Sequence, residues 1–239
     1  MDVTVAVLVL IVFAVPMLLI SVIIRLSSEG PIIFVQKRVG LNGRHFSIFK
    51  FRSMVAKSER KHGPGLTREG DVRITHVGRW LRKFKLDELP QFYNVLCGDM
   101  SLVGPRPKLP QYAEQRSLHF RPGITGAATI AFRSEEEILK HIEVAHLEQF
   151  YLRRIKPLKE RIDLRYMRNA TIWSDLGLIV KTFKVSFEPP RIPGSFRNSN
   201  HSQRNLQALP KRPVAERPVA APSRAVLTEA ECELAVVSD

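Results

Sequence analysis

The apolar positions form one long run near the N-terminus, followed by shorter amphipathic segments. Residues 3–24 are apolar except for Thr4, Pro16 and Ser21. At about 1.5 Å per helical residue, this run is long enough to cross a hydrocarbon core of about 30 Å. Pro16 removes a helix hydrogen bond near the middle, so we expect the helix to break there. Two topologies remain open: a kinked span, or a hairpin that returns to the side from which it entered.

Basic residues follow the apolar run closely. Arg25, Lys37, Arg38 and Arg44 lie within 20 residues of its end. Because cytoplasmic flanks of membrane segments are enriched in Lys and Arg, we expect the rest of the chain on the cytoplasmic face. The sequence therefore predicts a membrane-anchoring segment at 1–25 and a catalytic or binding body at 26–187.

Alternating residues then predict a β-hairpin. Residues 31–39 and 44–54 flank Leu41-Asn42-Gly43, and Asn-Gly between two alternating segments is a strong hairpin signal. Phe46, Ile48 and Lys50 fall on one face of the second arm. A basic hairpin with solvated lysines would show the same pattern.

A basic amphipathic helix is expected after Thr75, whose hydroxyl can cap its N-terminus. Apolar residues recur at helical spacing beside Arg79, Arg82 and Lys83; they are Val77, Trp80, Leu81 and Phe84. Such a helix suits a membrane interface, although a helix packed on the core would look similar. Arg82 lies five residues before Asp87 and is a candidate to face a substrate.

The segment 85–107 carries the chemistry. Asp87 is predicted as a helix N-cap, with Pro90 in the first turn and Gly98 ending the helix. Asp87 and Glu88 would then lie at a helix N-terminus, which favours their ionised forms. An ionised pair can hold a divalent cation or attack phosphorus, but both acids could equally be structural.

A rigid basic turn follows at Gly104-Pro105-Arg106-Pro107. Proline fixes the backbone on both sides of Arg106, so its guanidinium has little freedom left to lose on binding. Arginine matches phosphate oxygens bidentately. The turn therefore indicates an anionic ligand near the acid pair.

Further helices are expected downstream. Ser134 and Glu137 form a capping box that opens a helix to about residue 152, and Pro157 separates it from a helix at 158–168 that carries Asp163. A last helix at about 172–187 follows a Thr171 cap and sets apolar residues against lysines, as an interfacial helix would. Residues 188–239 are rich in Pro, Ser and Arg and are predicted to be disordered.

The net positive charge of the chain favours anionic partners. The chain has 37 Lys and Arg against 23 Asp and Glu, a net charge of +14. This excess points to nucleic acid, phospholipid headgroups or phosphorylated substrates. Two cysteines make neither a disulfide framework nor a metal-ligand spacing.

The motifs together resemble the bacterial sugar transferase family, the monotopic phosphoglycosyl transferases, over roughly residues 2–184. The central match is DELPQ, NV, GDMS and GPRP within 85–107. Others occur in the same order: QKRVG at 36–40, FKFRSM at 49–54, DVRIT at 71–75, RPGITG at 121–126, and the pair of acids at 163 and 175.

The resemblance implies an enzyme that transfers a phosphosugar from a UDP-sugar to polyprenyl phosphate through an aspartyl intermediate, at the inner face of the bacterial plasma membrane. It implies Asp87 as nucleophile, Glu88 with Asp87 as Mg²⁺ ligands, and Asp163 as a further active-site acid. Lys50, Arg106, Arg82 and Arg133 would bind substrate phosphate. A re-entrant helix broken at Pro16 would anchor the chain.

We therefore expect a helix-rich α+β fold: a small cytoplasmic catalytic domain with a β-hairpin, amphipathic interface helices and an N-terminal membrane helix. The alternative is a membrane-tethered basic module that binds nucleic acid or anionic lipid without catalysis. Such a module gives no role to Asp87, Glu88 or the rigid arginine turn, and no nucleic-acid motif is visible. An inactive family member is a third possibility that no motif favours.

Overall fold

The N-terminal apolar run forms two helices in the computed structural model, α1 (Asp2–Val12) and α2 (Ala14–Ser27), which are bent by 61°. The bend falls at Phe13, three residues before the predicted break. Pro16 lies in the first turn of α2, where it cannot donate to the Val12 carbonyl and its ring crowds that carbonyl. The proline therefore ends the helix that precedes it and is tolerated within the helix that follows.

The structure describes residues 1–55, 66–67, 70–113, 119–140, 142–186 and 188. Within them, no single helix is long and apolar enough to cross a membrane, and α1 and α2 meet that test only as a bent pair, by length and composition. The predicted disordered tail lies outside the described residues except for Glu188.

The predicted hairpin is confirmed. Strand β1 (Ile33–Val39) pairs antiparallel with β2 (His45–Phe51), with Val39 opposite His45. Asn42 and Gly43 in the connecting turn have φ angles of 53° and 80°, the left-handed region that Asn and Gly tolerate.

Arg52, just after β2, fastens the hairpin to the end of α2. Its guanidinium donates to the carbonyls of Ile24, Ser28 and Pro31 at 3.3, 2.6 and 2.5 Å. Carbonyls at a helix C-terminus have no partner within the helix, and a buried cation satisfies them. The sequence pattern gave no indication of this role.

Helix α3 (His76–Lys83) begins as predicted, because the Thr75 hydroxyl accepts the Gly78 N–H at 2.9 Å. Gly78 is required there, since an added Cβ would lie 2.0 Å from the Ser53 carbonyl oxygen. A 3-10 turn, η3 (Leu86–Glu88), and helix α4 (Gln91–Leu96) follow. Gly98, at φ 78°, ends α4 as expected.

The second sheet is a short parallel pair, β3 (Ser101–Val103) and β4 (Gly123–Thr125). The backbones on either side approach so closely that side chains would not fit. A Cβ on Gly104 would lie 2.4 Å from the Arg121 carbonyl oxygen, and one on Gly123 would lie 2.1 Å from the Gly104 nitrogen. A 3-10 turn, η4 (Pro110–Tyr112), lies between the two strands in sequence.

The C-terminal helices are α5 (Ala127–Ala131), α6 (Glu135–Lys140), α7 (Val144–Phe150), α8 (Lys156–Arg168) and α9 (Ile172–Ser186). The predicted single helix from Ser134 to about residue 152 is wrong, since α6 ends at Lys140 and α7 begins at Val144. The separation at Pro157 is also wrong. A π-helical stretch, η6 (Tyr151–Ile155), joins α7 to α8, and its wider turn accommodates a proline that lacks an N–H.

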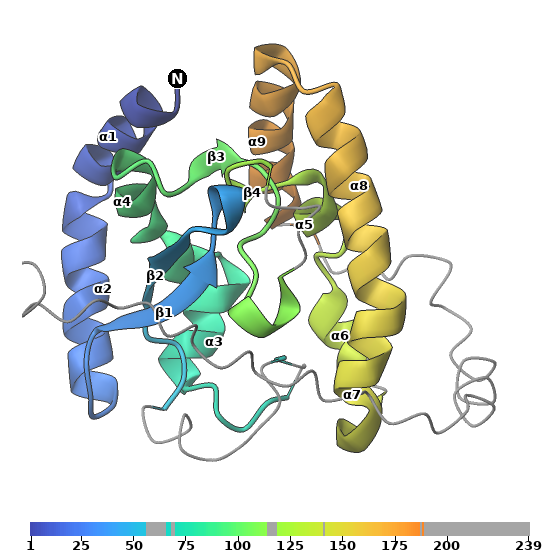
Figure 1. Cartoon of the computed structure of the whole chain (residues 1–239). Helices are drawn as coiled ribbons and strands as arrows, with labels where there is room; N and C mark the ends of the chain where they lie inside the picture. The colour runs from blue at the N-terminus through green and yellow to red at the C-terminus, as the bar shows by residue number, and fades with distance from the viewer. Residues whose placement is uncertain (56–65, 68–69, 114–118, 141, 187, 189–239) are drawn as a thin grey trace, which may run out of the picture. The chain divides into compact units, whose positions relative to one another are not determined.

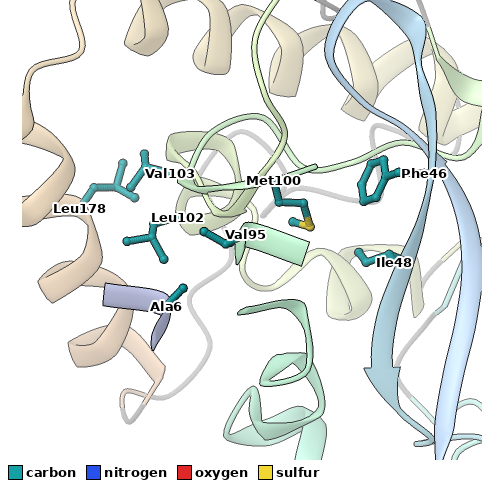
Figure 2. Close-up of a cluster of buried hydrophobic side chains, with 8 residues drawn as sticks. All are labelled: Ala6, Phe46, Ile48, Val95, Met100, Leu102, Val103 and Leu178. Atoms are coloured by element: carbon teal, nitrogen blue, oxygen red, sulfur yellow. The ribbon is translucent and has the colours of Figure 1, made fainter. Parts of the chain in front are cut away.

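Helices α1 and α9, which are far apart in the sequence, share one core. Figure 2 shows Ala6 of α1 and Leu178 of α9 in the cluster that also holds Leu102, Val103 and Val95, with Phe46 and Ile48 of β2 at its other side. In Figure 1 the blue helices α1 and α2 lie on one side of the hairpin and the yellow helix α8 on the other. The predicted helix-rich α+β class is confirmed; the predicted domain limits remain a prediction.

Apolar side chains also remain on the surface. On α1 and α2 they include Leu8, Ile11, Leu18 and Leu26, and on α9 Trp173 and Phe183, which are 82% and 69% exposed. Trp80 of α3 is half-exposed, while Leu81 beside it is buried. Helix α3 therefore packs on the core through Leu81, and its expected place at a membrane interface stays a prediction.

Candidate active site

The acid pair lies in the 3-10 turn η3, not at a helix N-cap. Lys85 adopts a left-handed conformation, at φ 59°, and the Glu88 N–H donates to its carbonyl at 3.1 Å. This tight turn draws both acids inward, so Asp87 and Glu88 are 6% and 7% exposed. A left-handed lysine is a strained conformation, which proteins tend to keep at functional sites.

Two cations converge on one oxygen of Glu88. Oε1 accepts Lys50 Nζ at 3.0 Å and Arg106 Nη2 at 2.8 Å. Burial alone would raise the pKa of Glu88, but the charges of Arg106 and Lys50 outweigh it and hold that pKa well below its usual range. Glu88 is therefore ionised at neutral pH and fixes two positive charges beside Asp87.

Lys50 reaches this point because Asn94 clamps β2 to α4. The buried Asn94 side chain accepts the Phe49 N–H at 3.1 Å and donates to the Ser47 carbonyl at 2.7 Å. These bonds occupy backbone groups of β2 and hold the strand against α4. Lys50 is thereby placed against Glu88, as the predicted face of the strand required.

Arg106 is positioned by the glycine contacts around its turn. The Gly104 N–H donates to the Thr125 carbonyl and the Gly123 N–H to the Pro105 carbonyl, both at 2.9 Å. Arg38 Nη1 donates to the Pro107 carbonyl at 3.0 Å. The predicted rigid turn is thus locked on both sides of the arginine, whose pKa is raised by the charge of Glu88.

Asp87 differs from its neighbour. Its Oδ1 atom is buried and has no hydrogen-bond partner among the described residues. Burial raises the pKa of Asp87, and the negative charge of Glu88 raises it further, while Lys50, Lys85 and Arg82 act in the opposite direction. An unpartnered buried carboxylate beside fixed cations is suited to attack an electrophile or to ligate a cation.

The donors present fit Mg²⁺ only in part. Asp87 Oδ1 is an orphaned oxygen that a cation would satisfy, and Glu88 lies next to it. In the part of the chain that the structure describes, no three His, Cys, Asp or Glu side chains gather into a metal site. Two carboxylates are nevertheless a usual protein contribution to a Mg²⁺ site, because Mg²⁺ commonly takes its remaining ligands from water and substrate phosphates.

Arg82 lies near the pair but is engaged elsewhere. Its Nη2 atom forms an ion pair with Glu136 Oε1 of α6. Its charge still lowers the pKa of Asp87, which places it within electrostatic reach of the acid pair.

Asp163 is buried at a different junction. Its Oδ1 accepts the Ala128 N–H at 2.9 Å, at the start of α5. Burial raises the pKa of Asp163 to about 6, opposed by that hydrogen bond and by the charges of Lys159 and Lys108. The other acid of the predicted pair, Asp175, lies in the first turn of α9 as expected and accepts the Tyr166 hydroxyl at 2.7 Å.

Arg133 lines a surface hollow of about 370 Å³ that none of the acid-pair residues borders. Its Nη1 atom donates to the Val185 carbonyl at 3.2 Å and approaches Glu188 at 3.4 Å. Lys181 and Lys184 of α9 line the same hollow. The structure thus brings Lys50, Arg106 and Glu88 into contact beside Asp87, but gives Arg133 and Asp163 other partners.

Sequence reasoning did not identify three residues that organise the site: Asn94, Glu136 and Lys159. Asn94 lay inside a helix predicted from its apolar stripe, and an asparagine on the inward face of a helix was the available signal. Glu136 and Lys159 pair with residues 54 and 24 positions away, which no local spacing reveals.

Comparison with known proteins adds a family match. The model of the bacterial sugar transferase family matches residues 1–189. A UDP-N-acetylgalactosamine-undecaprenyl-phosphate N-acetylgalactosaminephosphotransferase of Aeromonas hydrophila is 38% identical over 196 residues, covering 77% of this chain and 42% of that protein.

Two further relatives carry similar names. An undecaprenyl-phosphate glucose phosphotransferase of Komagataeibacter xylinus is 39% identical, over 77% of this chain and 34% of that protein. A UDP-glucose:undecaprenyl-phosphate glucose-1-phosphate transferase of Caulobacter vibrioides is 37% identical, over 76% of this chain and 66% of that protein. The chain therefore spans less than half the length of the first two relatives.

Proposed function

The chain belongs to the bacterial sugar transferase family, and from that membership and the geometry of its acid pair we propose that it transfers a phosphosugar from a UDP-sugar to undecaprenyl phosphate. The transfer would initiate synthesis of a polysaccharide or other glycoconjugate. The support lies in three relatives named as undecaprenyl-phosphate sugar phosphotransferases, two of them with a UDP-sugar in the name, and in the charges gathered around Asp87.

The single observation that carries the proposal is the contact of Glu88 with both Lys50 and Arg106 beside the unpartnered Asp87 oxygen. Phosphoryl transfer depends mainly on position and on neutralising the charge of the phosphate. Glu88 holds the side chains of Lys50 and Arg106 next to the Asp87 carboxylate. The positive charges that would bind an incoming phosphate are therefore in place before the substrate arrives.

In the first step, Asp87 would act as nucleophile. An Oδ atom attacks the phosphorus attached to the sugar, a new P–O bond forms, and the bond to the bridging oxygen breaks so that UMP leaves with that electron pair. Arg106 and Lys50 would stabilise the negative charge on the phosphate oxygens. In the second step, an oxygen of undecaprenyl phosphate attacks the same phosphorus and releases the Asp87 carboxylate.

Asp87 and Glu88 would hold Mg²⁺ together with the substrate phosphates. When bound, this ion supplies further neutralisation of phosphate charge. Arg82 is proposed as an additional phosphate contact. Arg133 and Asp163 are given no part in the transfer, because Arg133 contacts the end of α9 and Asp163 the start of α5.

The acceptor is a lipid, so we also infer that the chain works at the inner surface of the plasma membrane. The bent α1–α2 pair would serve as a re-entrant anchor, and its exposed leucines and isoleucines would contact acyl chains. Exposed Trp173 and Phe183 beside Lys181 and Lys184 would set α9 at the headgroup layer.

The rival function is a tethered basic module that binds anions without chemistry. Charge alone supports it equally well. It gives no reason, however, to bury Asp87 without a partner beside a carboxylate that is held ionised.

The test uses membranes that contain the full chain, labelled UDP-sugars and undecaprenyl phosphate. We expect lipid-linked phosphosugar and release of UMP from the wild type, loss of both in Asp87→Asn, and near-normal turnover in the control Glu143→Gln, whose carboxylate is 81% exposed and lies outside the acid pair. No product from the wild type with any UDP-sugar would contradict the proposed function. Full activity in Asp87→Asn would remove the nucleophile assignment.

A further inference from the structure

The first turn of α6 carries three consecutive acids, Glu135, Glu136 and Glu137. Two of them pair with cations from other helices: Glu136 with Arg82 of α3, and Glu135 Oε2 with Lys159 Nζ of α8 at 2.6 Å. The turn therefore connects α8 with α3, the helix that leads into the acid-pair turn.

Helix α6 is held in place by buried contacts. Ile138 and Leu139, in the next turn of α6, are buried, and the Glu135 carboxylate meets a lysine that is itself largely buried. Lys159 also lies over the rings of Phe132 and Tyr151, at 5.9 Å from each centroid. Because Glu135 and the apolar residues hold α6 in place, Glu136 is presented to Arg82 from a rigid support.

Arg82 is coupled to the acid pair through the backbone. Its carbonyl accepts the Lys85 N–H at 3.2 Å, and Lys85 is the left-handed residue that starts the turn containing Asp87 and Glu88. Among the described residues, the Arg82 guanidinium is engaged through Nη2 alone. A guanidinium has five N–H donors in one plane, so a carboxylate on one edge orients the other edge without blocking it.

We propose that Glu136 is a positioning residue that orients the Arg82 guanidinium toward the diphosphate of the donor, by pairing with it from the rigid first turn of α6. The inference rests on the proposed function, since it needs a diphosphate to be bound beside Asp87. Glu136 makes no contact with substrate in this account and acts through Arg82.

A partly exposed ion pair contributes little to stability, so the melting temperature should hardly change when the Glu136–Arg82 pair is lost. The affinity for the diphosphate then distinguishes a surface ion pair without function from one that positions Arg82. If the Glu136–Arg82 pair is a surface ion pair without function, replacing Glu136 should change neither the melting temperature nor the donor affinity. If it orients Arg82, the melting temperature should stay constant while the affinity for the diphosphate falls.

A double-variant cycle on the full chain in lipid nanodiscs tests this. UDP with Mg²⁺ serves as the binding probe, measured by titration calorimetry, and kcat and KM are measured with the UDP-sugar that the wild type uses. We expect Glu136→Gln to weaken UDP binding and raise KM about threefold to fivefold, with kcat nearly unchanged. Arg82→Gln should weaken binding at least as much, and the double variant should match Arg82→Gln alone, because Glu136 acts only through that arginine.

The matched control is Glu143→Gln, which removes a carboxylate that is 81% exposed, outside the site, and should leave UDP affinity unchanged. Unchanged affinity in Glu136→Gln would overturn the inference, as would losses that simply add in the double variant. In either case an active wild type leaves the proposed function intact. A wild type that neither binds UDP nor turns over any UDP-sugar would overturn the proposed function and this inference with it.

Discussion

Glu88 and Asp163 are two buried carboxylates with opposite electrostatics. Both are less than a tenth exposed. Glu88 contacts two cations and its pKa is driven down, whereas Asp163 accepts one backbone N–H and its pKa rises to about 6. The partners, and not the depth of burial, decide whether a buried acid keeps its charge. The acid-pair region is therefore organised for charge, and the junction of α5 and α8 for packing.

The largest effect that this contrast predicts is that of Glu88→Gln. Lys50 and Arg106 would then lose the carboxylate that both contact, so we expect turnover to fall at least about a hundredfold. The unfolding free energy should drop by about 2 kcal/mol, less than for a fully buried pair because Arg106 is partly solvated. Activity assays and chemical denaturation measure the two losses. A variant as stable and active as the wild type would break the contrast.

The pH dependence of turnover is the next largest effect. Asp87 must be ionised to attack, and burial with the charge of Glu88 raises its pKa, so kcat/KM should fall tenfold per pH unit below that raised pKa. Glu88 has a lowered pKa and stays ionised throughout. We expect the acidic limb to lie above the ordinary aspartate value of about 3.9. The same limb in Asp163→Asn would show that Asp163 is not its source, and a limb that disappears in that variant would assign it to Asp163.

Asp163→Asn should change stability more than activity. The folded-state pKa of about 6 exceeds the unfolded value, so the stabilising contribution of Asp163 is full below about pH 4 and is lost as the pH rises through 6. Asparagine keeps an oxygen for the Ala128 N–H and does not titrate. Between pH 4 and 7.5 the variant should gain up to about 3 kcal/mol in unfolding free energy relative to the wild type.

Turnover of Asp163→Asn at pH 7.5 should remain within about threefold of the wild type, since its described contacts are not with the acid pair. A loss of a hundredfold or more in a well-folded variant would instead support the role in the active site that the family resemblance implies, and would erase the distinction between the two regions.

The smallest effect is expected for Arg133→Gln. Arg133 donates to the Val185 carbonyl at the end of α9, whereas Arg106 contacts Glu88. The KM for the donor should therefore change by less than about twofold in Arg133→Gln, against tenfold or more in Arg106→Gln. Parallel titrations of the donor measure both. Equal effects would return Arg133 to the donor site.

Features set by residues close in sequence could be predicted. The hairpin followed from Asn42 and Gly43, the start of α3 from Thr75, and the end of α4 from Gly98. The side of β2 that carries Lys50 followed from alternation. Each of these features depends on the backbone and side-chain preferences of a few neighbouring residues, which the local sequence shows directly.

Features set by competition between local preferences were mispredicted. Aspartate is a preferred N-cap residue, but the left-handed Lys85 starts a tighter turn that buries Asp87. Pro157 should interrupt a helix, yet the π-helical turn before it removes the clash. Pro16 displaces the bend to Phe13 because the carbonyl it crowds lies four residues earlier.

Partners distant in sequence could not be predicted at all. Arg52 satisfies carbonyls 21 to 28 residues away, and Glu136 meets Arg82 across 54 residues. These contacts depend on how complete elements pack, so a list of charged positions contains the participants but not the pairing.

The central claim is that Asp87 forms a covalent bond to the phosphosugar, and mass spectrometry of the Asp87 peptide tests it most directly. The full chain is mixed with the UDP-sugar it uses and Mg²⁺, without undecaprenyl phosphate, then quenched in acid and digested. We predict a mass increase equal to one phosphosugar on the Asp87 peptide, which disappears on adding undecaprenyl phosphate and is never seen in Asp87→Asn. An active enzyme that transfers the sugar with no such adduct, or that carries it on another residue, would contradict the account.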